Sequence, residues 1–233
     1  MTEELFREDG YLRSCEAVVT AVTDRGFAVD RTVFYPVGGG QPGDTGSYRG
    51  PGGEGRIVDC YRDRDTGLHL HVVGEGTVIP GTGERVTLEI DWDHRYRLMR
   101  MHSCMHMLCA AVTAPVTGGS ISEDAGRLDF DLPSPPDRQA IEDRVNELIR
   151  SDVPMTLQWI TDEELDAKPD LVRTMSVQPP RGCGRVRLVN FHGVDLQPCG
   201  GTHVARSGEI GPVRIQSIKS KGKQNRRITM AFA

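Results

Sequence analysis

Two short motifs, far apart in the chain, carry side chains of the kinds that bind transition metals. His102-Ser-Cys-Met-His106 places two histidines four residues apart, and Cys199-Gly-Gly-Thr-His203 places a cysteine and a histidine at the same spacing. On a helix, side chains four positions apart lie one turn above each other on the same face, so two imidazoles can converge on one ion. Three histidines and one thiolate suit tetrahedral zinc. We therefore predict that His102, His106, Cys199 and His203 bind one Zn²⁺ per chain.

Either motif alone would be weak evidence for a metal, because histidines at this spacing are more often core or surface residues. The alternative that both helix histidines are hydrogen-bonded core residues stays open. Cys104 and Cys183 are further thiols that could reach an ion. Cys104 lies two positions from each histidine, so a helix would turn it to the other face.

The elements that must position these motifs form a mixed α and β pattern. Residues 95–112 contain few turn-forming residues and have apolar side chains at helical spacing, namely Leu98, Met101, Met105, Leu108 and Val112. Asp137 is a predicted N-cap, and Thr161-Asp-Glu-Glu164 is a predicted capping box. Predicted strands follow the first helix at residues 127–132, 155–160, 185–191, 213–218 and 227–232. This mixture predicts an α+β domain over residues 93–233.

The residues before this helix have the pattern of a small β-barrel. Short β-prone runs cover 15–23, 27–33, 56–60, 68–73 and 85–90, with glycine-rich turns between them. The segment 34–46 breaks this pattern with three consecutive glycines, Gly38, Gly39 and Gly40, which permit positive φ or a close approach to the backbone. We predict an N-terminal barrel domain over residues 1–92, so the fold class is α+β.

Composition limits the classes of protein that fit. The chain has 233 residues and a formal net charge of -5, which argues against a general nucleic-acid binder, although the last 30 residues are basic. No apolar run approaches the length of a membrane span, and the N-terminus lacks the apolar region of a signal peptide. Six cysteines without a C-x2-C pair fit a reducing compartment. We therefore expect a cytoplasmic protein without a membrane partner.

Several of these motifs together resemble one known family. They are the glycine loop, the H-x3-H pair, the run from Asp195 to His203, and the terminal Gly222-Lys-Gln-Asn-Arg-Arg-Ile228. In combination they resemble the alanyl-tRNA editing family, which comprises the editing domain of alanyl-tRNA synthetase and its freestanding AlaX-type relatives. The resemblance runs from about residue 34 to the C-terminus, and the chain is too short to include an aminoacylation domain.

The resemblance implies a zinc-dependent hydrolase that acts without ATP on Ser-tRNA(Ala), with Gly-tRNA(Ala) as a further substrate. It also implies that the second domain is the editing domain and that mischarged tRNA is the partner. No protein partner is evident. The residues between the helix histidines, which are commonly small or threonine in the family, are Ser103, Cys104 and Met105 here, so the wall of the pocket is expected to differ.

The expected chemistry is hydrolysis of an activated ester, which needs a positioned water and a stabilised oxyanion. Zinc can act as a Lewis acid or lower the pKa of bound water, but four protein ligands would close the site unless one position exchanges. Gln41 is the predicted catalytic side chain of the glycine loop, because its amide can donate and accept. Thr202 is the second catalytic candidate. Gly38, Gly39, Gly40, Gln41 and Asp44 are the predicted substrate-binding residues, although Gln41 could cap a turn and Asp44 fits a turn better than a general base.

Clustered basic residues predict where a tRNA backbone could be held. They are Arg97 and Arg100 beside the histidine pair, and Lys219, Lys221, Lys223, Arg226 and Arg227 near the C-terminus. Such clusters contact phosphates without reading sequence. A solvated basic end is the simpler interpretation.

Two other functions remain open at this point. One is a zinc-stabilised RNA-binding module without catalysis. The other is a deacylase for a different mischarged tRNA, such as Ser-tRNA(Thr).

Overall fold

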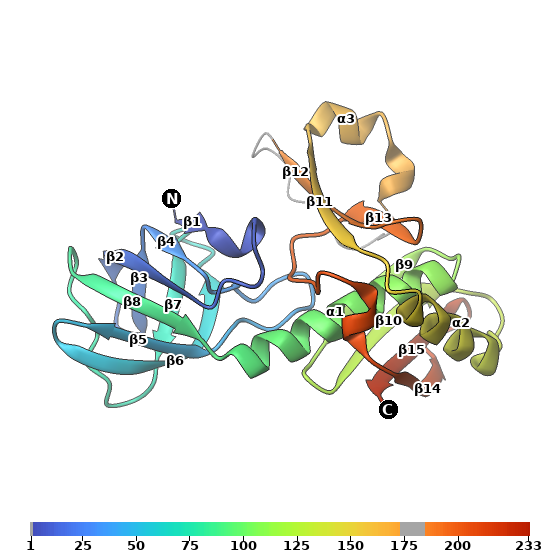
Figure 1. The fold of residues 1–233 in the computed structure, drawn as a ribbon, viewed down its shortest axis with the longest axis horizontal. Helices are drawn as coiled ribbons and strands as arrows, with labels where there is room; N and C mark the ends of the chain where they lie inside the picture. The colour runs from blue at the N-terminus through green and yellow to red at the C-terminus, as the bar shows by residue number, and fades with distance from the viewer. Residues whose placement is uncertain (1, 173–184) are drawn as a thin grey trace. The chain divides into compact units, whose positions relative to one another are not determined.

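The computed structural model describes residues 2–172 and 185–233. The chain divides into two compact units, Met1–Tyr96 and Arg97–Ala233. The first runs from blue to green in Figure 1 and the second from green to red. The division falls within the first helix, α1 (Trp92–Ala111). Cys183, a possible further thiol ligand, lies outside the described residues.

The first unit is a closed β-barrel of six strands, as the spacing of the β-prone runs predicts. Around the barrel the strand order is β2-β3-β7-β6-β5-β8. Their bounds are β2 Ser14–Val22, β3 Gly26–Val29, β5 Gly46–Gly50, β6 Gly53–Arg62, β7 His69–Val73 and β8 Arg85–Ile90. In β8 the buried Val86, Leu88 and Ile90 alternate with more exposed residues. This alternation is expected when one face of a strand packs against a core.

Some short elements of the first unit were not predicted from the sequence. Strand β5 begins at Gly46, directly after the glycine loop. A Cβ atom at Gly46 would lie 2.1 Å from the carbonyl oxygen of Glu89, so only glycine lets β5 approach β8 there. The two-residue strand β1 (Glu3–Glu4), which is followed by a short 3₁₀ helix, η1 (Leu5–Arg7), pairs in parallel with β4 (Arg31–Thr32), a strand within the predicted run 27–33.

The second unit contains most of α1 and two antiparallel sheets. A four-stranded sheet has the order β14-β15-β10-β9, and a three-stranded sheet has the order β11-β12-β13. Their bounds are β9 Val116–Ile121, β10 Ala125–Asp131, β11 Met155–Ile160, β12 Val186–Phe191, β13 Asp195–Pro198, β14 Val213–Ser220 and β15 Asn225–Phe232. The other helices among the described residues of this unit are α2 Arg138–Arg150, α3 Asp162–Asp166, η2 Pro169–Leu171 and η3 Ser207–Ile210. The predicted mixture of helices and strands is confirmed.

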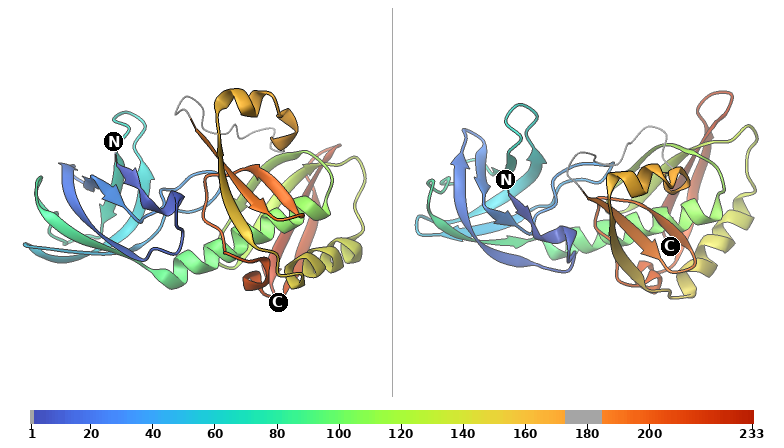
Figure 2. Two further views of the ribbon diagram at one scale, coloured as in Figure 1. Left: turned by 45° about the horizontal axis from the view of Figure 1, so that its top comes forward. Right: turned by 90° about the horizontal axis from the view of Figure 1, so that it is seen from above.

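Helix α1 lies between these two sheets, and its two faces differ. The five predicted apolar positions are all buried, namely Leu98, Met101, Met105, Leu108 and Val112. Met101 and Met105 lie against Gly126 of β10, where an added Cβ would come within 3.0 Å of both side chains. His106 instead faces Asp195 of the three-stranded sheet. Figures 1 and 2 show β11 in gold and β12 and β13 in orange on one side of the green helix, and β14–β15 in red on the other.

Helices α2 and α3 begin where their capping residues predict. The Asp137 side chain accepts the backbone N–H of Ala140 and caps α2. Thr161 and Glu164 form the reciprocal hydrogen bonds of a capping box at α3. These caps satisfy backbone donors that a helix start otherwise leaves without partners.

Candidate functional site

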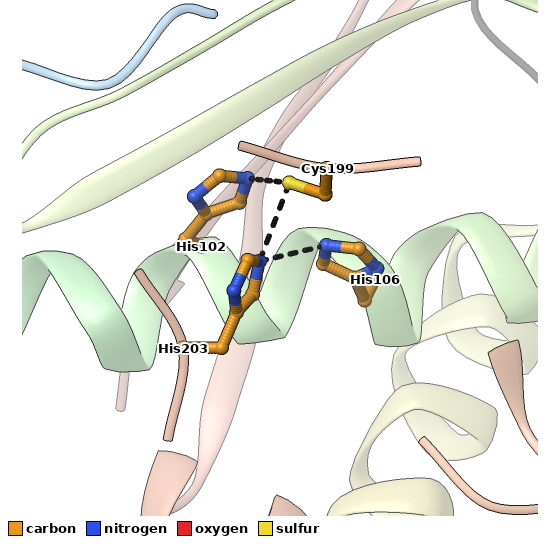
Figure 3. Close-up of side chains that lie close together, drawn as sticks. All are labelled: His102, His106, Cys199 and His203. Atoms are coloured by element: carbon orange, nitrogen blue, oxygen red, sulfur yellow. Dashed lines mark hydrogen bonds between the residues drawn. The ribbon is translucent and has the colours of Figure 1, made fainter. Parts of the chain in front are cut away.

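The four predicted metal-binding side chains lie together in the second unit. His102 and His106 project from one face of α1, and Cys199 and His203 come from the segment that follows β13. Their ligand atoms all lie within 4.8 Å of one another. Figure 3 shows the imidazole nitrogens and the thiol sulfur converging on one point. Cys104 is buried elsewhere in the helix and is not part of this group.

The spacing of these atoms matches a tetrahedral zinc site. Zinc bonds of about 2.1 Å to nitrogen and about 2.3 Å to sulfur place two nitrogens about 3.4 Å apart, and nitrogen and sulfur about 3.6 Å apart. Cys199 Sγ lies 3.4 Å from His102 Nε2 and 3.5 Å from His203 Nε2. His203 Nε2 lies 3.0 Å from His106 Nε2. The donor set therefore fits zinc in both chemistry and dimensions.

Ring orientation also allows three imidazoles to meet at one ion. The lone pair of a ring nitrogen lies in the ring plane, so the planes of converging ligands must cross. The rings of His102 and His203 are inclined by 43°, and those of His106 and His203 by 79°. His106 and His203 are buried, whereas His102 and Cys199 are partly exposed. The edge formed by His102 and Cys199 is therefore the accessible edge of the site.

The protonation of the group is set by its own members. Burial alone would raise the pKa of the Cys199 thiol, but the adjacent His102 and His203 hold that pKa well below its usual value. Burial lowers the pKa of His203. Burial also opposes the charge on His106, yet hydrogen bonds to Asp195 and Cys199 raise its pKa to about 9. The thiolate, which is the form that binds metals, is thus the favoured state of Cys199.

Two side chains fix the Cys199–His203 segment against the rest of the unit. Arg187 of β12 is buried, and its Nη1 donates to the carbonyl oxygens of Cys199 at 2.9 Å and Gly201 at 2.8 Å. Ser103 of α1 accepts the backbone N–H of Val204 through Oγ at 3.1 Å. Both ends of the second motif are therefore held independently of any ion.

The contacts of Arg187, Ser103, Asp195 and Gln197 were not predicted from the sequence. Asp195 and Gln197 are buried alternate residues of β13, whereas Leu196 between them is half-buried. Polar residues with a period of two, just before a predicted metal ligand, are a signal that could have found this pair. The contacts of Arg187 and Ser103 depend on how distant segments pack and leave no such pattern.

The glycine loop is a tight turn in the first unit. Gly38 and Gln41 exchange backbone hydrogen bonds of 3.1 and 2.9 Å. Gly39 and Gly40 between them have φ angles of 55° and 83°, the pair of positive values that a type I′ turn requires. The expected positive φ is therefore present at two of the three glycines. Gln41 is buried, while Gly39 and Gly40 are exposed.

Asp44 anchors this loop within the barrel unit. Its carboxylate accepts two hydrogen bonds from Nε of the fully buried Arg95, at 2.9 and 3.1 Å, and one from the backbone N–H of Tyr35. Arg95 also donates to the carbonyl oxygen of Val33 at 2.6 Å. These bonds agree with a turn residue more than with a substrate contact. Thr202, the second catalytic candidate, is fully buried in the other unit.

The predicted tRNA-binding arginines beside the histidine pair have partners within their own unit. Arg100 donates to the carbonyl oxygen of Ile210 at 3.0 and 2.8 Å, and its guanidinium lies 4.3 Å from the ring centroid of Phe232. Arg97 pairs with Glu123 at 3.7 Å and with Asp124. The Arg100 contacts give that residue a structural role, and a role in tRNA binding stays a prediction for both.

The C-terminal basic run divides into inward and outward residues on the β14–β15 hairpin. Arg226 is buried and donates to the carbonyl oxygens of Gly222 at 3.0 Å and Pro133 at 2.8 Å. Arg227 makes a two-pronged pair with Asp129, with both distances 2.7 Å. The exposed cations of the run are Lys219, Lys221 and Lys223.

A second group of metal-binding residue types lies in the barrel. Cys60, His69 and His71 are buried, with candidate ligand atoms also within 4.8 Å of one another. Cys60 Sγ lies 2.9 Å from His69 Nε2, and His71 Nε2 lies 2.8 Å from the hydroxyl of Thr32. The rings of His69 and His71 are stacked with an interplanar angle of 9°. Parallel stacked rings do not aim their lone pairs at one point, so we assign no metal here.

Comparison with known proteins identifies the class to which this fold and site belong. Residues 186–229 match the family model described as threonyl and alanyl tRNA synthetase second additional domain. Residues 10–94 match the model described as tRNA synthetases class II (A). Each of the two units thus contains a segment that matches a tRNA synthetase domain model.

Full-length relatives narrow this class to one family. The chain is 36% identical to the alanyl-tRNA editing protein AlaX-M of Methanosarcina acetivorans and 32% identical to that of Saccharolobus solfataricus, over 98% of each chain. It is also 36% identical to the alanine–tRNA ligase of Pyrobaculum calidifontis, over 94% of this chain and 25% of the ligase. The chain belongs to the AlaX-M family of alanyl-tRNA editing proteins. The resemblance drawn from its motifs is confirmed.

The described helices include none with both the length and the apolar character of a membrane span.

Proposed function

We propose that this protein is a trans-editing deacylase that hydrolyses the ester of mischarged Ser-tRNA(Ala), with Gly-tRNA(Ala) as a second substrate. The observation that carries the proposal is the zinc-sized arrangement of His102, His106, Cys199 and His203 in a chain whose full-length relatives are named alanyl-tRNA editing proteins. These four residues would hold one zinc ion. Bound zinc would supply Lewis-acid polarisation of the ester or a water of lowered pKa.

The need for such an enzyme follows from the limits of selection by size. A small apolar pocket rejects an isostere with an added hydroxyl by only about 10²-fold, so serine is attached where alanine belongs. An editing site that hydrogen-bonds the serine hydroxyl refuses alanine, because alanine would leave buried polar groups without partners.

Access to the ester is proposed from the edge formed by His102 and Cys199. Their partial exposure contrasts with the burial of His106 and His203 and supports approach from that edge. Four protein ligands make a closed site, so a substrate atom would enter by displacing one ligand or by expanding the coordination shell. Thr202, between two of the ligands in sequence, is proposed to bind the seryl hydroxyl.

The glycine loop is proposed to take part in binding the substrate. The exposed backbone of Gly39 and Gly40 permits a close approach of substrate. Gln41 is proposed to hold the ester carbonyl or the attacking water through its amide. Gly38 would contribute backbone contacts, whereas the bonds of Asp44 to Arg95 leave it a supporting role.

The test combines deacylation with metal analysis. Wild-type protein should release serine from Ser-tRNA(Ala) faster than alanine from Ala-tRNA(Ala), and should contain about one zinc per chain, as a single four-ligand site holds one ion. Cys199→Ala should lose most of the zinc and the activity. Gln41→Ala should lower deacylation roughly 10- to 100-fold at unchanged zinc content, within the range usual for one catalytic hydrogen-bonding group.

Other outcomes would support the rival functions. Tight zinc and tRNA binding without release of serine would indicate an RNA-binding module and overturn the proposed hydrolysis. Faster release from Ser-tRNA(Thr) than from Ser-tRNA(Ala) would assign a different tRNA. Unchanged zinc content in Cys199→Ala would remove Cys199 from the site.

A further inference from the structure

Behind His106, on the side away from the other three ligand candidates, lies a buried carboxylate. His106 Nδ1 is 2.7 Å from Asp195 Oδ2, and the Asp195 side chain is fully buried. Gln197 Nε2 lies 2.8 Å from the same carboxylate oxygen. The other ring nitrogen, His106 Nε2, faces inward and lies 3.0 Å from His203 Nε2. His106 is thus held between the centre of the site and β13.

Strand β13 presents both polar groups to the helix. It pairs with β12 through Asn190 opposite Leu196 and Val189 opposite Gln197. Side chains alternate along a strand, so Asp195 and Gln197 point to the same face and Leu196 to the other. The register of the β12–β13 pair therefore sets the position of the carboxylate relative to His106 on α1.

The geometry determines which nitrogen of His106 carries the proton. A metal would bind His106 in its neutral form, which has one N–H, and an ionised carboxylate can only accept a hydrogen bond. The proton therefore lies on Nδ1, where it is donated to Asp195, and the lone pair of Nε2 points into the site. In this tautomer the amide of Gln197 donates to Asp195 Oδ2, because Nδ1 of His106 is itself a donor.

His203 has no equivalent support. Its Nδ1 is buried and has no hydrogen-bond partner within residues 2–172 and 185–233. A carboxylate next to His106 also opposes the positive charge that one thiolate would leave on a divalent ion. Orientation and charge both assign the supporting role to Asp195.

We propose that Asp195 is a positioning residue of the zinc site, which holds His106 in the Nδ1–H tautomer while Gln197 orients the carboxylate. This inference rests on the zinc site of the proposed function. Asp195 touches neither substrate nor metal. Its effect is on the affinity for zinc and on the orientation of one ligand, which is the usual action of a carboxylate behind a ligating histidine.

Zinc affinity in purified full-length variants provides the first test, measured by competition with a chromophoric chelator. Asp195→Ala should weaken zinc binding about 10- to 100-fold, the usual effect of losing such a partner. Asp195→Asn keeps an acceptor oxygen without the charge and should lose less. Asp129→Asn is the matched control, because Asp129 is a buried carboxylate of the same unit that pairs with Arg227 instead. It should bind zinc as the wild type does.

The tautomer of His106 in the zinc-loaded wild type provides the second test and does not depend on any variant folding. Long-range ¹H–¹⁵N spectra should show a protonated Nδ1 and a metal-bound Nε2. A proton on Nε2, or a metal bound through Nδ1, overturns the proposal. So does a folded Asp195→Ala protein with the zinc affinity of the wild type. A wild type that binds no zinc overturns the zinc site itself, and is thereby distinguished from a failure of Asp195 alone.

Discussion

His71 and His106 are both buried, yet their pKa values move in opposite directions because their neighbours differ. Burial lowers the pKa of His71 to about 3, and the adjacent His69 adds to this effect. Among the described residues, the groups at hydrogen-bond distance from His71 are neutral, namely the Thr32 hydroxyl and the carbonyl oxygen of Phe27. His106 is buried as well, but the carboxylate of Asp195 raises its pKa to about 9. One residue type thus serves as a neutral core group in one unit and as a site group in the other.

The first prediction concerns the pH dependence that His71 confers on the barrel. Above pH 6.5, its usual value, neither folded nor unfolded chain protonates this histidine. Between pH 6.5 and about 3 only the unfolded chain binds the proton, so His71 lowers the free energy of unfolding by roughly 1.4 kcal/mol for each unit that the pH falls. His71→Gln should remove this term, so the stability difference between wild type and variant should shrink as the pH is lowered.

Hydrogen exchange of the β3 and β7 amides in the full chain would measure this difference. His192→Gln, at an exposed histidine of the other unit, is the control and should leave the barrel's response to pH unchanged. A difference between wild type and His71→Gln that is constant from pH 6.5 to 4 would contradict the prediction.

At the residue scale, the sequence predicted groups whose roles are local and missed those that depend on packing. The four metal-binding candidates stand out by type and spacing, and the structure brings their ligand atoms together. Asp195 lies four residues before Cys199, but its role arises because β13 packs against α1 about ninety residues away in sequence. The contact between Asp195 and His106 therefore leaves no local pattern in the sequence.

At the scale of elements, the β14–β15 hairpin shows how a strand sorts its charges. Arg226 follows the period of two set by the buried Ile228 and Met230, and so points to the inner face of the sheet. In the sequence these basic residues were treated as one cluster. The period of two could have shown which of them point inward. The helices were easier to predict, because caps such as Asp137 are local signals.

The prediction at this scale separates the exposed lysines from Arg226. Changing Lys219, Lys221 and Lys223 together to glutamine should weaken tRNA binding and reduce the dependence of log K on log salt by about 2 to 3, because about one ion is released for each phosphate contact. Turnover at saturating Ser-tRNA(Ala) should stay near that of the wild type, since these residues would touch no reacting atom.

Arg226→Gln serves as the comparison. It removes an internal donor to Gly222 and Pro133, so it should lower thermal stability. Filter binding across a salt series would measure the tRNA affinity of both variants, and thermal unfolding would measure their stability. If the lysine triple variant had the tRNA affinity and the salt dependence of the wild type, these lysines would take no part in tRNA binding.

At the scale of the whole molecule, the two units should respond differently to loss of metal. All four proposed ligands belong to Arg97–Ala233, and none to Met1–Tyr96. A ligand that binds only the folded state stabilises it by about 4 kcal/mol when its free concentration is 1,000 times Kd. Chelation should therefore destabilise the second unit and leave the barrel nearly unchanged.

Hydrogen exchange resolved by unit, with and without a chelator, would measure this effect. Cys199→Ala should show no response to the chelator in either unit. An equal loss of protection in barrel and second unit would mean that the two unfold together, and would count against their independence.

The two halves of the proposed metal site are made at very different times. His102 and Cys199 are separated by 97 residues, and the strands β9 to β13 are synthesised between them. During translation the helix histidines emerge first and offer a two-ligand fragment that any of several divalent ions can occupy weakly. Selectivity for zinc can arise only when the thiolate arrives and the loop closes, at an entropic cost that grows slowly with its length. Selective binding of zinc is thus possible only after Cys199 and His203 have been synthesised.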